Sequence, residues 1–172
     1  SMRETCREAG VYIITGDTKV VEKGSLGGCV INTSGIGRRN EALERNIAEV
    51  KRHRSFEARW ILDSNLREGD KIIVSGTLGD HGLAVLSAQE GYGFEGRIAS
   101  DVAPLNKPII HLLNVGGIVS MKDPTRGGLS NALNEWSEKS GVGILIHEEE
   151  IPIRGDVRTA CEMLGIDPLE VG

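Results

Sequence analysis

Short apolar runs alternate with helical patterns along this chain, and glycine-rich turns join them. Continuous apolar runs rich in β-branched residues are typical of strands. They lie near residues 71–75, 117–121 and 142–147. Apolar residues spaced three and four positions apart, bounded by Asp or Gly, predict helices. These lie near residues 80–90, 127–139 and 156–164, with Asp80 and Asp156 as caps. Because periodicities and caps agree, the sequence predicts an α+β domain over residues 70–165.

The N-terminal part of the chain is less regular. Residues 2–9 have the apolar spacing of a helix. Two β-branched runs at 11–22 and 28–37 predict a hairpin around a glycine-rich loop. Residues 40–54 carry a thin apolar stripe among many charges, with Asn40 as a possible cap, which predicts a surface helix or a mobile linker.

Composition excludes several classes of partner. The formal net charge is −5, from 20 basic and 25 acidic residues, whereas broad contact with nucleic-acid phosphates needs a basic face. Two Trp, two Tyr and two Phe provide few platforms for stacking on single strands, so the core is expected to be aliphatic. Three cysteines without a CxxC pair and the absence of a long apolar run indicate a reduced, cytoplasmic protein with no membrane span.

The first of three strand-to-turn junctions is Gly16-Asp17-Thr18-Lys19. A carboxylate and a hydroxyl can ligate Mg²⁺, and an ammonium can bind phosphate or transfer a proton. The alternative is a plain β-turn in which Asp17 bonds its own backbone. In an extended strand Asp17 and Lys19 would share one face, where they could also form a surface ion pair.

The second junction is SGTLGDHGLAVL at residues 75–86. It joins a strand pattern to a helix N-terminus, and such an end is receptive to anions. His81 lies in the first turn of the predicted helix and can titrate near neutral pH. The alternative is a capped helix with an exposed histidine.

The third junction is MKDPTRGGLSNAL at residues 121–133. Asp123 begins a turn, and Arg126 can form bidentate hydrogen bonds with phosphate or carboxylate. Gly127 and Gly128 stand at a helix start, where glycine carries an entropic cost. That cost indicates either a bound ligand or a tight backbone crossing.

Four motifs occur together in the order and spacing of a known family: ITGDTKVVEKG, INTSGIG, IVSGTLGDHGLAVL and KDPTRGGL. They resemble the hydrogenase maturation factor HypE, a family of the PurM-like (aminoimidazole ribonucleotide synthetase) superfamily. The resemblance runs from about Met2 to Glu170. Each motif alone is weak, but four in series are specific. The fold implied is a PurM-like pair of α+β domains.

The resemblance implies an ATP-dependent dehydratase of [NiFe] hydrogenase maturation. In that family a carbamoyltransferase partner of the HypF type places a carbamoyl group on the enzyme's own C-terminal cysteine. ATP activates the carbamoyl oxygen, and the thiocarboxamide is dehydrated to a thiocyanate. The cyanide then passes to iron on scaffold proteins of the HypC and HypD type. A homodimer is also implied.

Residue roles follow from the same resemblance. Gly16, Asp17 and Thr18 are expected beside ATP and Mg²⁺, with Asp17 as the Mg²⁺ ligand, and Lys19 is expected to be catalytic. The two later turns are expected to line the cleft between the two domains. Their residues are Asp80, His81, Gly82, Asp123, Arg126, Gly127 and Gly128.

The chain departs from the family pattern near its ends. It lacks the upstream aspartate motif that supplies most ATP and Mg²⁺ contacts, and it lacks the tail with the acceptor cysteine. Cys161 lies on the apolar stripe of a helix and is expected in the core, so it cannot replace that cysteine. We therefore expect a fragment that is inactive alone and binds ATP weakly or not at all.

The resemblance also predicts a division of the chain into three parts. Residues 1–37 are the C-terminal part of the ATP-binding first domain, residues 38–69 are a charged linker or insertion, and residues 70–172 are most of the second domain. Two other functions stay open. One is another PurM-like ATP enzyme, of the thiamine-phosphate kinase or aminoimidazole synthetase type, and the other is a non-catalytic docking module for maturation partners.

Overall fold

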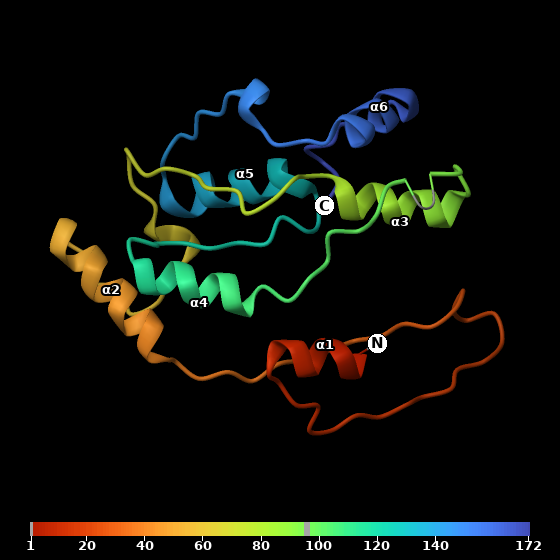
Figure 1. Cartoon of the computed structure of the whole chain (residues 1–172), viewed down its shortest axis with the longest axis horizontal. Coiled ribbons are helices and arrows are strands. Elements are labelled where there is room, and N and C mark those ends of the chain that lie inside the picture. Colours follow the sequence, from red (N-terminus) through yellow and green to blue (C-terminus); the bar gives the residue numbers. More distant parts are fainter. Residues whose placement is uncertain (1, 95–96) are drawn as a thin grey trace.

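The computed structural model describes residues 2–94 and 97–172, and the regular elements in these ranges are all helical. Figure 1 shows their arrangement. In chain order they are α1 (Met2–Ala9), α2 (Glu41–His53), the short 3₁₀ helix η1 (Asp63–Asn65), α3 (Asp80–Glu90), α4 (Asn106–Val115), α5 (Gly128–Ser140), η2 (Glu148–Glu150) and α6 (Gly155–Leu164). None of these helices is long and apolar enough to cross a membrane, within the residues described.

Helix α2 begins after Asn40, as the sequence predicts. The side-chain oxygen of Asn40 accepts a hydrogen bond from the Leu43 N–H at 2.9 Å, which caps the helix. The apolar stripe that includes Leu43, Ile47 and Val50 is buried and packs against α4. The structure therefore contains the helix rather than the mobile linker. How the chain divides into domains stays a prediction.

A second hydrophobic cluster joins α3 to α6. Leu83 and Val157 are fully buried there, and Cys161 is 1% exposed. The core position predicted for Cys161 is confirmed. Burial disfavours the charged thiolate, so it raises the pKa of the Cys161 thiol.

The predicted helices form within one residue of their expected bounds, but two of their predicted caps are wrong. Gly79, with φ 83°, precedes α3, and Asp80 is the first helical residue. Arg154 precedes α6, and Asp156 lies inside its first turn. A glycine in the left-handed region turns the chain sharply into α3, so no side-chain cap is needed to start the helix.

The predicted strands do not form ladders within residues 2–94 and 97–172. Residues 71–75 and the segment predicted as a buried strand at 142–149 are largely exposed, and Leu145 is 84% exposed. At 117–121 a side chain takes the place of a neighbouring strand. The buried Asn46 amide donates to the Ile118 carbonyl at 2.7 Å and accepts from the Ile118 N–H at 2.8 Å. Apolar runs favour extended backbone, but a ladder also needs a second strand beside it.

The hairpin predicted at 11–37 is an extended excursion in the structure. Its two halves run out and back below the helices, with a turn at 23–28 (Figure 1). Every residue from 11 to 37 is exposed, and no ladder joins the halves in this fully described segment. The Asn106 side chain donates to the Ala9 carbonyl at 2.8 Å, which ties the end of α1 to α4.

Candidate functional site

The structure brings the second and third predicted turns together through the segment 167–172. An ideal Cβ on Gly82 would lie 2.5 Å from the Gly172 carbonyl oxygen. One on Gly128 would overlap the Leu169 carbonyl, which also accepts a hydrogen bond from the Ser130 N–H at 3.0 Å. In Figure 1 the C-terminus accordingly lies between α3 and α5.

Gly127 and Gly128 therefore have a structural explanation. Their φ angles are 76° and 59°, in the left-handed region that favours glycine. Backbone of 169–170 passes directly over Gly128, and an added Cβ would lie 2.8 Å from the Glu170 carbonyl carbon. Of the two alternatives that the sequence leaves open, ligand or crossing, the structure contains the tight crossing.

Asp80 and His81 lie side by side in sequence but in different environments. Asp80 is 2% exposed, and its carboxylate accepts a hydrogen bond from the Thr77 hydroxyl at 2.6 Å and lies 3.5 Å from the Arg154 guanidinium. His81 is exposed, with Nδ1 2.9 Å from the Ser100 hydroxyl. Asp80 thus holds the turn in place, whereas His81 is accessible to a ligand.

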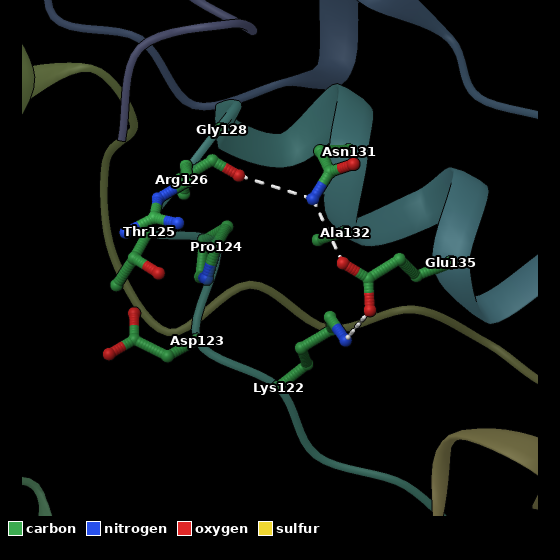
Figure 2. A pocket seen from close by; sticks show the side chains of 9 residues that line it. All are labelled: Lys122, Asp123, Pro124, Thr125, Arg126, Gly128, Asn131, Ala132 and Glu135. Atoms are coloured by element: carbon green, nitrogen blue, oxygen red, sulfur yellow. Dashed lines mark hydrogen bonds and ion pairs between the residues drawn. The ribbon is translucent and has the colours of Figure 1, made fainter.

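A pocket of about 410 Å³ opens beside the third turn. Figure 2 shows that one wall is the loop before α5 and the other is the first two turns of that helix. Its lining residues are Lys122, Asp123, Pro124, Thr125, Arg126, Gly128, Asn131, Ala132 and Glu135. Polar and charged side chains predominate, so the pocket suits a charged ligand better than an apolar one.

Two of the lining residues, Lys122 and Glu135, belong to a closed ring of four charges with Asp63 and Lys139. The Lys122 ammonium lies 2.9 Å from the Asp63 carboxylate and 2.7 Å from that of Glu135. The Lys139 ammonium lies 2.8 Å from the same two carboxylates. Asp63 also accepts a hydrogen bond from the Trp136 indole at 3.2 Å. The ring joins η1, α5 and the end of the 117–121 segment, and its formal charges cancel.

The ring fixes the charge state of its members. Hydrogen bonds from Lys122, then Lys139, then Asn131 lower the pKa of Glu135 to about 2. Hydrogen bonds from the two lysines lower the pKa of Asp63, and those to the two carboxylates raise the pKa of Lys122 and of Lys139. At neutral pH all four groups are charged, so Lys122 is no candidate for a general base.

Asp123 and Arg126 remain available to a ligand. Within the described residues no hydrogen bond or ion pair engages the Asp123 carboxylate or the Arg126 guanidinium, and both residues are exposed. In Figure 2 both groups lie on the side of the loop away from Glu135. Because the ring neutralises Lys122, Arg126 is the cation of the pocket that is open to an anionic group.

The first predicted junction lies apart from this pocket. Residues Gly16 to Lys19 belong to the exposed excursion, which in Figure 1 lies beside α1 and below α3. The Asp17 carboxylate accepts a hydrogen bond from the neighbouring Thr18 N–H at 2.8 Å, and residues 16–19 form no turn. The fully described residues 16–19 contain no ion pair between Asp17 and Lys19.

The donor set for Mg²⁺ and ATP is partial in this chain. Asp17 and Thr18 offer one carboxylate and one hydroxyl, hard oxygen ligands of the kind that Mg²⁺ accepts. Within residues 2–94 and 97–172 no group of three or more His, Cys, Asp or Glu side chains is placed to hold a metal ion. Asp17 and Thr18 therefore fit Mg²⁺ as part of a ligand set to which other residues must also contribute.

Sequence reasoning missed the ring and its role beside the pocket. Asn131, Glu135 and Lys139 follow each other at i, i+4 and i+8 on α5, a spacing that could have indicated linked side chains. Nothing in the local sequence links Asp63 to this group, because the contact spans distant parts of the chain.

Comparison with known proteins agrees with this geometry. The family model of the AIR synthase related protein, C-terminal domain, matches residues 67–171. The chain belongs to this family. The matched range contains both glycine turns, the pocket and all but the last residue of the segment that joins them.

The chain is also similar over almost its whole length to proteins of hydrogenase maturation. It is 49% identical to the putative hydrogenase expression/formation protein of Methanocaldococcus jannaschii, over 99% of this chain and 46% of that protein. It is 42% identical to the carbamoyl dehydratase HypE of Bradyrhizobium diazoefficiens, over 99% of this chain and 45% of that protein. The chain thus spans about half the length of these relatives.

Solved structures support the PurM-like fold. The crystal structure of the hydrogenase maturation protein HypE in complex with ATP matches 99% of this chain and 47% of that one, with a TM-score of 0.77 and 34% identity. The HypE chain of a HypE–HypF complex matches 99% of this chain and 51% of that one, with a TM-score of 0.74 and 39% identity. The expected PurM-like architecture is therefore confirmed, although the described elements here are helices.

Proposed function

We propose that this chain is part of an ATP-dependent carbamoyl dehydratase of hydrogenase maturation. The observation that carries the proposal is the similarity over 99% of the chain to relatives named carbamoyl dehydratase HypE. The same names favour this activity over that of a thiamine-phosphate kinase or an aminoimidazole synthetase.

The reaction proposed is the loss of one water from a cysteine thiocarboxamide. The carbamoyl oxygen attacks the terminal phosphorus of ATP, and ADP leaves. The nitrogen then gives up two protons while the C–O bond breaks, so that thiocyanate and inorganic phosphate form. ATP supplies the phosphoryl group that turns a poor leaving oxygen into a good one. A group that accepts protons and a group that stabilises the leaving phosphate are both needed.

We assign these roles to residues of all three turns. Asp17 and Thr18 would contribute to the Mg²⁺ and phosphate site, and Lys19 would move a proton or stabilise charge at the thiocarboxamide. His81 and Arg126 would contact the substrate from the domain cleft, since both are accessible. Asp80 would act indirectly by holding the turn, because its carboxylate is buried. A HypF-type carbamoyltransferase and iron-carrying scaffold proteins of the HypC and HypD type are the proposed partners, and the complete protein is proposed to be a cytoplasmic homodimer.

The test uses the complete, carbamoylated protein with ATP and Mg²⁺. Conversion to thiocyanate is measured by mass spectrometry as the loss of one water from the C-terminal cysteine. We expect Lys19→Ala to fold and bind ATP but to slow dehydration by ~100-fold or more, the usual scale for a lost acid, base or charge stabiliser. Lys23→Ala, in the same excursion, is the matched control and should leave the rate unchanged. Dehydration at the wild-type rate in Lys19→Ala would remove Lys19 from the mechanism, and no water loss in the wild type would reject the dehydratase itself.

A further inference from the structure

The loop of the third turn, residues 122–126, is held at both of its ends by one carboxylate. At the first end the Lys122 ammonium lies 2.7 Å from Glu135 Oε2. At the other end the Asn131 side-chain amide donates to the Arg126 carbonyl at 3.2 Å and to Glu135 Oε1 at 2.9 Å. Figure 2 shows this chain of contacts from Arg126 through Asn131 and Glu135 to Lys122.

The two carboxylate oxygens of Glu135 accept hydrogen bonds from different donors. Oε2 accepts from the two lysines of the ring, whereas Oε1 accepts from Asn131. A carboxylate has enough lone pairs for all three hydrogen bonds, and charge-assisted bonds of this kind are stronger than neutral ones. Glu135 is rooted in the middle of α5, so the loop is fixed to a rigid element rather than to another loop.

The residues between the two anchors are the ones left free for a ligand. Asp123 and Arg126 point away from Glu135 in Figure 2, and within the described residues no hydrogen bond or ion pair engages their charged groups. An arginine binds an anionic group in two parallel hydrogen bonds more favourably when its backbone is already held in place. The anchors at Lys122 and Asn131 therefore contribute to the position of the Arg126 guanidinium.

We propose that Glu135 is a positioning residue that clamps the 122–126 loop at both ends, so that Arg126 is presented to an anionic group of the substrate or nucleotide. The clamp is a property of this chain and stands by itself. Its consequence for turnover rests on the proposed function, in which this loop lines the cleft. In this proposal Glu135 acts on the loop rather than on the ligand, since its carboxylate already accepts from the two lysines and Asn131.

Lys139 offers a matched control for this clamp. It contacts the same two carboxylates as Lys122, at 2.8 Å, but it lies on α5 and contacts neither end of the loop. Lys139→Met therefore removes two ion pairs of the ring and keeps both anchors. Glu135→Gln also weakens the ring, but it removes the charge that holds Lys122 and weakens the acceptor that orients Asn131 towards the Arg126 carbonyl.

The experiment compares wild type, Glu135→Gln, Asn131→Ala and Lys139→Met in the complete protein. Amide hydrogen exchange reports the loop directly. The Thr125 N–H donates to the Asp123 carbonyl at 2.9 Å, and the Gly128 N–H donates to the Thr125 carbonyl at 3.3 Å. We expect these two amides to exchange at least ~10-fold faster in Glu135→Gln than in Lys139→Met, while the thermal midpoints of these two variants fall by similar amounts. Asn131→Ala should speed exchange at Gly128 more than at Thr125, because it releases only the Arg126 end.

Steady-state kinetics give the second readout. We expect Glu135→Gln to raise the KM for ATP or for the carbamoylated tail by ~10-fold or more, and Lys139→Met to change it by less than about twofold. Equal exchange in the two variants would overturn the clamp even if the wild type dehydrates its tail. Rapid exchange in Glu135→Gln with an inactive wild type would support the clamp and reject the proposed function.

Discussion

Gly128 is a residue at which neighbouring backbone leaves little room for a side chain. Its φ of 59° lies in the region where an L side chain costs roughly 1–2 kcal/mol, and an added Cβ would meet backbone of 169–170. Backbone can give way less easily than a side chain. We expect Gly128→Ala to lower the free energy of unfolding by more than about 3 kcal/mol, as measured by urea denaturation.

Gly141 is the control for that substitution. It ends the same helix with φ 69°, and an added Cβ would meet nothing within 4 Å. Gly141→Ala should therefore cost only the conformational part, about 1 kcal/mol. If both variants lose the same free energy of unfolding, the backbone of 169–170 must leave room for a methyl group at residue 128.

At the scale of single elements, acid should weaken the charge ring. The pKa of Glu135 in the folded chain is about 2, below its ordinary value of 4.5, so the unfolded chain binds more protons between these values. The contribution of the ring to the free energy of unfolding is complete above about pH 4.5, and it is lost as the pH falls towards 2. The lowered pKa of Asp63 acts in the same direction.

The measurement is a set of unfolding midpoints between pH 6 and pH 2. In Glu135→Gln the decline of the midpoint over this range should be shallower than in wild type, because one of the two titrating carboxylates is gone. Glu138→Gln on the same helix, outside the ring, should follow the wild-type curve. A Glu135→Gln curve parallel to wild type would mean that the ring contributes nothing to acid sensitivity.

Helices and strands differ in how well the sequence predicts them. The apolar stripe of α2 and the patterns of α3, α5 and α6 are local, since a helix bonds to itself, and each was predictable within a residue or so. The runs at 71–75 and 142–147 have strand composition, but a strand depends on a neighbour that periodicity cannot reveal. The same holds for Asn46, whose amide replaces a neighbouring strand at Ile118.

In the candidate site, too, local features were predictable from the sequence and contacts between distant segments were not. The motif at 121–133 indicated Asp123, Arg126 and either a ligand or a close backbone approach at the two glycines, because turn chemistry is local. It could not indicate that residues 169–170 supply that approach, nor that Asp63 completes a ring with α5. The places of Asp17 and Lys19 in a shared site stay a prediction.

At the scale of the whole molecule, the excursion at 11–37 presents an unusual amount of apolar surface. Tyr12, Ile14, Val20 and Ile36 are each 84% or more exposed. Extended backbone with unpaired groups and apolar side chains favours pairing with another chain. We expect residues 1–172 in isolation to self-associate in analytical ultracentrifugation, and Ile14→Lys to shift the distribution towards monomer.

Leu145→Lys is the control, because Leu145 is equally exposed but lies outside the excursion. It should leave the sedimentation distribution unchanged. A distribution that shifts with both substitutions would indicate general loss of apolar surface rather than pairing at 11–37. One that shifts with neither would mean that the excursion does not self-associate.

The crossing of 167–172 over two glycine turns has a consequence for biosynthesis. Translation proceeds from the N-terminus at ~5–20 residues per second, so the turns at Gly82 and Gly128 are made before the segment that closes them. For several seconds on the ribosome α3 and α5 exist with their N-terminal turns uncovered. A pause of the ribosome before residue 167 should prolong that interval, and a chaperone that recognises open helix ends would meet this chain then.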